Sequence, residues 1–209
     1  MSLRADLALI SEWIKPGSRI LDLGCGDGTL LKHLRDNAKV SGFGIEIDHG
    51  DIVKCIESDI NVIQSDLDEG INNYFDADSF DYVVMTQALQ AIKHPEELLD
   101  EILRVSSDAI ITFPNMGYWS NRFQLGIRGH MPVTKSLPHY WYNTPNIHLC
   151  TLSDFENLCK ERSIRIIKRR VVDSRHKHGN ILLKLFPNLF GEIAIYHITK
   201  KQVGRKINL

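Results

Sequence analysis

The sequence predicts a single α/β domain whose sheet is mostly parallel and covered by helices on both faces. Apolar runs with strand character alternate along the chain with segments in which apolar residues recur at helical spacing. Residues 81–85 are apolar at nearly every position, which is typical of a strand buried on both faces. A chain of 209 residues is long enough to bury the core of one such domain.

The first half of the chain contains most of this alternation. Leu7, Ile10 and Ile14 share one face of an expected first helix, which Pro16 and Gly17 end. The strands expected next are residues 19–23, 40–47, 61–64, 81–85 and 109–113, and the helices between them are residues 29–35, 51–58 and 95–105.

The helix expected at residues 95–105 has well-defined start signals. Pro95 suits the first helical position, and Glu96 and Glu97 complement the positive end of the helix dipole. The apolar residues expected on its inward face are Leu98, Leu99, Ile102, Leu103 and Val105.

The alternation stops after residue 113. Residues 114–150 are rich in Pro, Gly, Trp, Tyr and His and show little periodicity, so we expect them to form a cap inserted over the top of the sheet. The whole of residues 1–200 is expected to be one domain. Its last part is expected to contain a helix at 153–162, strands at 164–172 and 192–199, and an apolar segment of undecided structure at 181–190, before a frayed tail at 201–209.

Composition excludes several classes of protein. The chain is 43% hydrophobic and 24% charged with a net charge of −1, which gives no general attraction to nucleic acids or membranes. Arg4, Asp6 and Glu12 interrupt the apolar residues at the N-terminus, so no signal-peptide core is present there. Four cysteines without a CxxC pair indicate reduced thiols, and the expected location is the cytoplasm.

A glycine-rich loop follows the first expected strand, in the stretch ILDLGCGDGTL at residues 20–30. Gly24, Gly26 and Gly28 allow a tight turn and a close approach of a ligand to the N-terminus of the next helix. The spacing is G-x-G-x-G, and Thr29 stands where a dinucleotide fingerprint needs its last glycine. A nicotinamide cofactor is therefore disfavoured, although a plain tight turn remains an alternative for the loop alone.

Carboxylates end the first three expected strands and indicate the ligand. Glu46 can accept both hydroxyls of a ribose, and Asp66 can reach an exocyclic amine on a base. Asp22, beside the glycine loop, can hold a cationic amino group. A ligand with an adenosine, an amino-acid end and no diphosphate fits S-adenosylmethionine. Each carboxylate taken singly also fits a solvated strand end.

These residues resemble class I S-adenosylmethionine-dependent methyltransferases. The stretch FDYVVMTQALQAIKHPEELLDEILRV at residues 80–105 looks like the fourth strand and the following helix of that superfamily. A narrower resemblance, from residue 19 to residue 162, is to the MetW family of methionine biosynthesis proteins. Its most specific parts are TFPNMGYWSNRFQL and RGHMPVTKSLPHYWYNTPNIHLCTLSDFENLC.

The resemblance implies a seven-stranded Rossmann-like sheet with a reversed hairpin at its end. It also implies a set of cofactor contacts at Asp22, Gly24, Gly26, Glu46, Asp66 and Leu67. Neighbouring candidates for the same S-adenosylmethionine or S-adenosylhomocysteine site are Cys25, Gly28, Ile47 and Gln87.

Two functional hypotheses follow from this resemblance. In the first, the protein activates or regulates MetX, the homoserine O-acyltransferase of methionine biosynthesis, and S-adenosylmethionine is a sensed ligand. In the second, it transfers a methyl group to a small molecule. Many superfamily members have a histidine where this chain has Ala91, and Gln87 and Gln90 are polar but are not bases. No residue is therefore assigned as catalytic.

The expected cap contains three histidines, His130, His139 and His148, among many aromatic residues. A polar catalytic pocket, a protein-contact surface and simple aromatic packing all remain open. The wide spacing of the histidines disfavours a zinc site, and no metal is expected. A basic run at residues 165–170 is expected on an edge strand. The thiol of Cys25 is near a helix N-terminus, which can lower its pKa, but its small size explains its place more simply.

Overall fold

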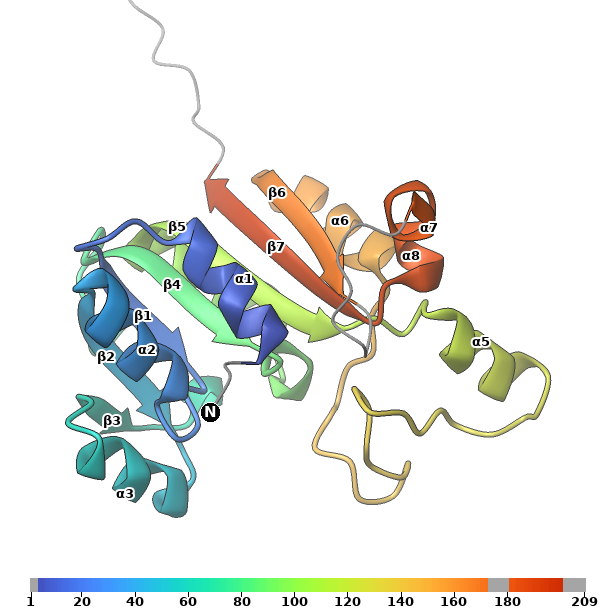
Figure 1. The fold of residues 1–209 in the computed structure, drawn as a ribbon, viewed down its shortest axis with the longest axis horizontal. Coiled ribbons are helices and arrows are strands. Elements are labelled where there is room, and N and C mark those ends of the chain that lie inside the picture. The colour runs from blue at the N-terminus through green and yellow to red at the C-terminus, as the bar shows by residue number, and fades with distance from the viewer. Residues whose placement is uncertain (1–3, 173–180, 201–209) are drawn as a thin grey trace, which may run out of the picture.

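The computed structural model describes residues 4–172 and 181–200, which form one seven-stranded sheet (Figure 1). The strand order is β3-β2-β1-β4-β5-β7-β6. The strands from β1 to β5 are parallel, and β7 runs antiparallel between β5 and β6. The predicted mostly parallel sheet with a reversed end is thus confirmed. Its strands are β1 (Arg19–Leu23), β2 (Ser41–Glu46), β3 (Val62–Gln64), β4 (Phe80–Thr86), β5 (Ser106–Pro114), β6 (Ile164–Val172) and β7 (Ile193–Lys200).

The helices connect these strands and lie on both faces of the sheet. The short helices α7 and α8 occupy the apolar segment whose structure the sequence left undecided. The α-helices are α1 (Ala5–Trp13), α2 (Thr29–Ala38), α3 (His49–Glu57), α4 (Pro95–Val105), α5 (Trp119–Gly126), α6 (Leu152–Glu161), α7 (Ile181–Leu185) and α8 (Pro187–Phe190), and the 3-10 turns are η1 (Leu67–Glu69) and η2 (Leu89–Ala91).

One face of the sheet is covered by α1, α2 and α3. Side chains alternate between the faces of a strand, so Ile20, Val84 and Ile110 from three neighbouring strands point to the same side. They belong to one buried apolar cluster with Ile10 of α1 and Leu34 of α2. Figure 1 shows α1 and α2 lying along this face, which brings the start of α1 toward the carboxyl ends of β1 and β4.

The opposite face carries the second and larger apolar cluster. Leu21, Val83 and Ile111 pack there against α4 and α6. Leu99 of α4 and Phe155 of α6 are fully buried members of this cluster. The two clusters hold the sheet rigidly between helices, so the loops at its carboxyl edge start from fixed positions.

Two features of the second half differ from the expectation. β5 begins at Ser106, directly after α4, because the buried Ser106 hydroxyl donates to the carbonyl of Ile102 and the chain passes from helix to strand without a loop. The region expected to be irregular contains helix α5, which leaves the carboxyl end of β5 and projects away from β1, β2 and β3 (Figure 1). The predicted tail at 201–209 lies outside the described residues.

One edge of the sheet agrees with the prediction from the sequence. β6, which carries the basic run, forms one edge, as predicted. Arg169 on this strand pairs with Glu156 of α6 at 2.7 Å. Within the described residues no helix combines the length and the apolar character needed to cross a membrane.

Candidate functional site

The glycine loop after β1 turns at the carboxyl edge of the sheet, and all three glycines have positive φ. Gly24, Gly26 and Gly28 have φ of 68°, 54° and 75°, a region that strains other residues. A Cβ at Gly24 would lie 3.2 Å from the Cβ of Ala88, so this turn packs against the loop after β4. Within the described part of the chain, a Cβ at Gly26 would meet nothing within 4 Å. The loop is thus packed at its first glycine and open at its second.

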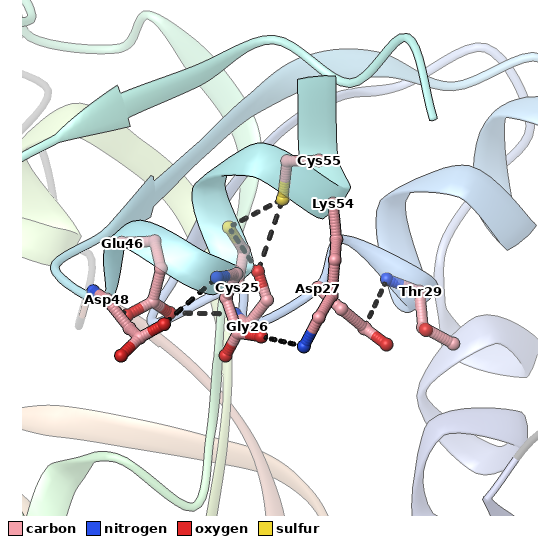
Figure 2. A network of polar contacts seen from close by, with 9 residues as sticks. Cys25, Gly26, Asp27, Thr29, Glu46, Asp48, Lys54 and Cys55 are labelled. Carbon is pink, nitrogen blue, oxygen red and sulfur yellow. Dashed lines mark hydrogen bonds and ion pairs between the residues drawn. The ribbon is translucent and has the colours of Figure 1, made fainter. Parts of the chain in front are cut away.

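Glu46, at the end of β2, is bound to this loop (Figure 2). One carboxylate oxygen, Oε2, accepts the N–H of Gly26 at 2.8 Å. The other, Oε1, accepts the N–H groups of Ile47 at 2.8 Å and Asp48 at 3.0 Å. Three backbone donors therefore fix the carboxylate beside the open glycine. The side chain of Ile47 is itself exposed.

Asp22 is a buried carboxylate next to Glu46. Its side chain is 1% exposed, and its Oδ1 atom has no hydrogen-bond partner among the described residues. Burial, followed by repulsion from Glu46, raises the pKa of Asp22 from 3.8 to about 7, while Arg4 acts in the opposite direction. A buried acid with a free oxygen fits a ligand that carries a positive charge.

Asp66 and Leu67 lie at the same edge, beyond the end of β3. The N–H of Ser65 donates to the carbonyl of Glu46 at 3.1 Å, which places Asp66 next to the end of β2. Asp66 is half-buried and caps η1, because its Oδ1 accepts the N–H of Asp68 at 2.9 Å. The structure therefore brings the predicted site residues of β1, β2 and β3 to one edge of the sheet.

Gln87, after β4, lies at this edge too, but its amide already has a partner. The residue has φ of 53°, and its Nε2 donates to Oδ2 of Asp6 at 3.2 Å. Asp6 is buried and pairs with Arg4 at 2.8 Å. Sequence reasoning missed this contribution of α1. The available signal was a single acid, Asp6, next to apolar residues of the first helix.

The two cysteines near the loop are inert thiols. Cys25 Sγ lies 3.9 Å from Cys55 Sγ, and both contact the carbonyl of Gly26 (Figure 2). Burial raises the pKa of both thiols, so the helix N-terminus does not activate Cys25. A Cβ at Gly44 would lie 2.3 Å from the Cys25 sulfur, which indicates tight packing around that small side chain.

The cap is the segment 114–150, and its end is bound to the loop after β4. The N–H groups of Ile147 and His148 donate to the carbonyl of Gln90 at 2.8 and 2.9 Å. Nε2 of Gln90 in turn donates to the carbonyl of Gln87 at 2.6 Å. The ring of His148 contacts the carbonyl of Lys93 at 3.1 Å. A continuous chain of hydrogen bonds therefore joins α1, the loop after β4 and the cap.

Asn115, next to the end of β5, has a structural role. Its Nδ2 donates to the carbonyls of Asn188 and Gly191, and its Oδ1 accepts the N–H of Gly117. Its own carbonyl accepts Nδ2 of Asn121. These contacts hold the start of the cap against the segment that leads into β7.

Sequence comparison assigns the chain's relatives. A family model described as methionine biosynthesis protein MetW matches residues 4–198. The bifunctional methionine biosynthesis protein MetXA/MetW of Rhodopirellula baltica is 35% identical over 175 residues, which cover 79% of this chain and 28% of that protein. The chain therefore spans less than a third of the length of that relative.

Solved structures share the fold at low identity. Phosphoethanolamine N-methyltransferase 2 of Haemonchus contortus, crystallised with S-adenosyl-L-methionine, matches with a TM-score of 0.69 and 18% identity, covering 94% of this chain and 52% of that chain. The [4+2]-cyclase SpnF matches with a TM-score of 0.65 and 17% identity, covering 93% and 80%. One fold therefore carries proteins described as a methyltransferase and as a cyclase, so the fold alone does not decide the reaction.

Proposed function

This chain belongs to the MetW family of methionine biosynthesis proteins, and from that premise we propose that it binds S-adenosylmethionine and acts as an activating or regulatory partner of the homoserine O-acyltransferase MetX. The observation that carries the partnership is the bifunctional relative, whose name joins MetXA and MetW in one protein. Two proteins that are fused in one relative commonly work on the same step. A fused chain also keeps both parts at a high effective concentration.

The residues at the carboxyl edge suit the proposed ligand. Asp22 offers the cationic amino-acid end a buried oxygen that has no hydrogen-bond partner among the described residues, and Gly26 leaves open space beside it. Glu46 would hold the ribose hydroxyls, and Asp66 with Leu67 would hold the base. Bound S-adenosylmethionine would supply a sulfonium methyl group. The neighbouring candidates Cys25, Gly28, Ile47 and Gln87 shape or border the same edge.

The proposed ligand space at Gly26 gives a direct prediction. Gly26→Ala places a methyl group in the open space beside Glu46, so affinity for S-adenosylhomocysteine should fall more than about tenfold, which is about 1.4 kcal/mol. Because residue 26 has positive φ, alanine at this position should also lower the free energy of unfolding by about 1–2 kcal/mol. Isothermal titration calorimetry and urea unfolding measure the two effects.

Gly17→Ala is the matched control for this change. Gly17 has φ of 76° and also has open space at its Cβ position, but it lies in the turn between α1 and β1. It should lose similar stability and keep full affinity. Equal affinity in wild type and Gly26→Ala would contradict the proposed placement of the ligand.

A regulatory role is supported by the connection between the ligand edge and the cap. The glycine loop packs at Gly24 against Ala88, and Gln90 in the same connecting segment accepts two N–H groups from the cap. A ligand that shifts this segment would change the cap through differential affinity for two arrangements. S-adenosylmethionine, which forms later in the pathway, would thereby regulate the acyltransferase according to its own concentration.

The test of the proposed function is homoserine acylation by the purified acyltransferase with this protein absent, present, and present with S-adenosylmethionine. A rate that rises on adding the protein supports an activating subunit. A further change on adding S-adenosylmethionine supports sensing of that ligand. An unchanged rate in all three mixtures, together with no complex in sedimentation, would overturn the partnership.

Methyl transfer to a small molecule is the second candidate. The carboxylates of Asp22, Glu46 and Asp66 lie at one edge, where they would hold the sulfonium cofactor. Methyl transfer from a sulfonium needs mainly alignment of donor and acceptor, so a site that holds the cofactor favours this candidate. The two glutamines after β4 both have their amides bound within the protein, to Asp6 and to the carbonyl of Gln87. Release of labelled methyl from the cofactor to an extract component would support this candidate over a purely sensory site.

A further inference from the structure

The cap carries an unusual set of exposed apolar side chains. Trp119 and Phe123 of α5 and Ile127, the residue that follows this helix, recur every four residues and are all exposed, and Ile127 is 75% exposed. Trp141, 73% exposed, follows further along the cap. Exposed apolar side chains concentrated in one segment of a folded protein favour an interaction site there.

These side chains are held in place although they face solvent. The rings of Tyr140 and Tyr142 stack with centroids 5.6 Å apart, and Trp141 meets Tyr142 edge-on at 5.7 Å. Gln124 of α5 accepts the N–H of Val133 at 3.2 Å, which joins the helix to the following loop. An aromatic surface that is ordered before binding loses little conformational entropy when a partner docks.

The surface includes a small pocket suited to one anchoring side chain. It has a volume of about 40 Å³ and is lined by residues that include Met131, Leu137, Trp141 and Leu149. Its size is too small for a nucleotide but fits a partner's side-chain tip. Anchoring residues in such pockets carry a large share of the energy in protein interfaces.

The charge of the cap is uniform in sign. The sequence contains no aspartate or glutamate between Asp108 and Asp154, while Arg122, Arg128 and Lys135 lie in that interval and are exposed. Arg128 stacks over the ring of Phe123 at 5.3 Å. In a chain of net charge −1, the cap is therefore a segment that is both cationic and aromatic. A complementary partner surface would be acidic with apolar anchors.

We infer that the cap presents its cationic and aromatic side chains, Ile127, Trp141 and Arg128 among them, as the face that docks the homoserine O-acyltransferase. The inference rests on the proposed function, because the bifunctional relative is what names the partner. It adds the location of the interface and the chemistry of the surface that the acyltransferase must present. The mixture of aliphatic side chains with the anchoring pocket favours a protein over RNA as the occupant.

The experiment measures the affinity of the full-length protein for the purified acyltransferase by calorimetry. Ile127→Asp and Trp141→Ala should each weaken the complex by about tenfold to a hundredfold. Arg128→Glu should weaken it and reduce its dependence on salt. Ile56→Asp on α3 is the matched control, since Ile56 is 63% exposed and lies far along the chain from the cap. It should leave the affinity unchanged.

The outcomes separate this inference from the function on which it rests. If wild type binds the acyltransferase and all three cap variants bind equally well, the interface lies elsewhere and the proposed function stands. If wild type does not bind at all, the proposed function fails and the inference with it. Loss of RNA binding, vesicle binding or self-association in the cap variants, with acyltransferase binding intact, would assign the face to another occupant and overturn the inference. Unchanged affinity for S-adenosylhomocysteine verifies that each variant is folded.

Discussion

Replacing Asp22 with asparagine is expected to stabilise the ligand-free protein above neutral pH and, at the same time, to remove most of its affinity for S-adenosylmethionine. Asp22 is buried at the end of β1, one of its oxygens has no partner among the described residues, and Glu46 repels it. An ionised acid in that position lowers stability because Arg4 offsets only part of the penalty, and a cationic ligand would compensate the rest. Stability and binding therefore depend on this side chain in opposite directions.

The pH dependence of this effect follows from the pKa of Asp22, which is raised from 3.8 to about 7. The folded protein holds the Asp22 proton more tightly than the unfolded chain does, so stability falls as pH rises from about 4 to about 7 and stays low above that range. The full penalty is about 4 kcal/mol at 1.36 kcal/mol per pKa unit. Because asparagine keeps a buried polar group, Asp22→Asn should gain about 1–3 kcal/mol at pH 8.

Urea unfolding at pH 8 and pH 5.5 measures this prediction. The advantage of Asp22→Asn over wild type should shrink by about 2 kcal/mol between the two pH values, because wild type becomes protonated. Asp78→Asn is the control, since Asp78 is exposed, has φ of 57° and precedes β4 at the opposite edge of the sheet. An identical pH slope in wild type and Asp22→Asn would show that Asp22 titrates normally.

The sequence predicted the sheet and the position of the glycine loop because both depend on local patterns. The run at 81–85 became the central strand β4, and Gly24, Gly26 and Gly28 all required positive φ. Carboxyl ends of parallel strands meet at one edge, so Asp22, Glu46 and Asp66 were expected together and do lie together. Periodicity and strand order were sufficient for these features.

Other features depend on contacts between distant segments, which local patterns do not encode. The start of α1 reaches the site through the bond from Gln87 to Asp6, across 81 positions of the sequence. Helix α5 was missed because its apolar side chains, Trp119 and Phe123, are few and face solvent instead of a core. The space beside Gly26 is another such feature, because among the described residues a Cβ there would meet nothing within 4 Å. Only the assembled edge shows that this space is available to a ligand.

Glu46 has less capacity for a ligand than its position at the end of β2 suggested. A carboxylate offers about four acceptor positions, and backbone N–H groups of Gly26, Ile47 and Asp48 use three of them. Two ribose hydroxyls therefore need at least one of these N–H groups to be released. The donor from Gly26 belongs to the loop that must admit the ligand, so its release is the most direct way to bind the ribose and to move the loop.

Glu46→Ala is accordingly expected to weaken S-adenosylhomocysteine binding by ten- to hundredfold, or about 1.5–3 kcal/mol. It should also lower the free energy of unfolding by about 1–2 kcal/mol, because three N–H groups lose their acceptor. Asp48→Ala separates the two effects: Asp48 caps α3 by accepting the N–H of Asp51 at 3.0 Å, so this variant should lose about 1 kcal/mol of stability and keep its affinity. Calorimetry and urea unfolding of both variants decide the matter. Full affinity in Glu46→Ala would show that Glu46 does not bind the ribose. The position of the open Gly26 beside this acid would then not be explained by ligand binding.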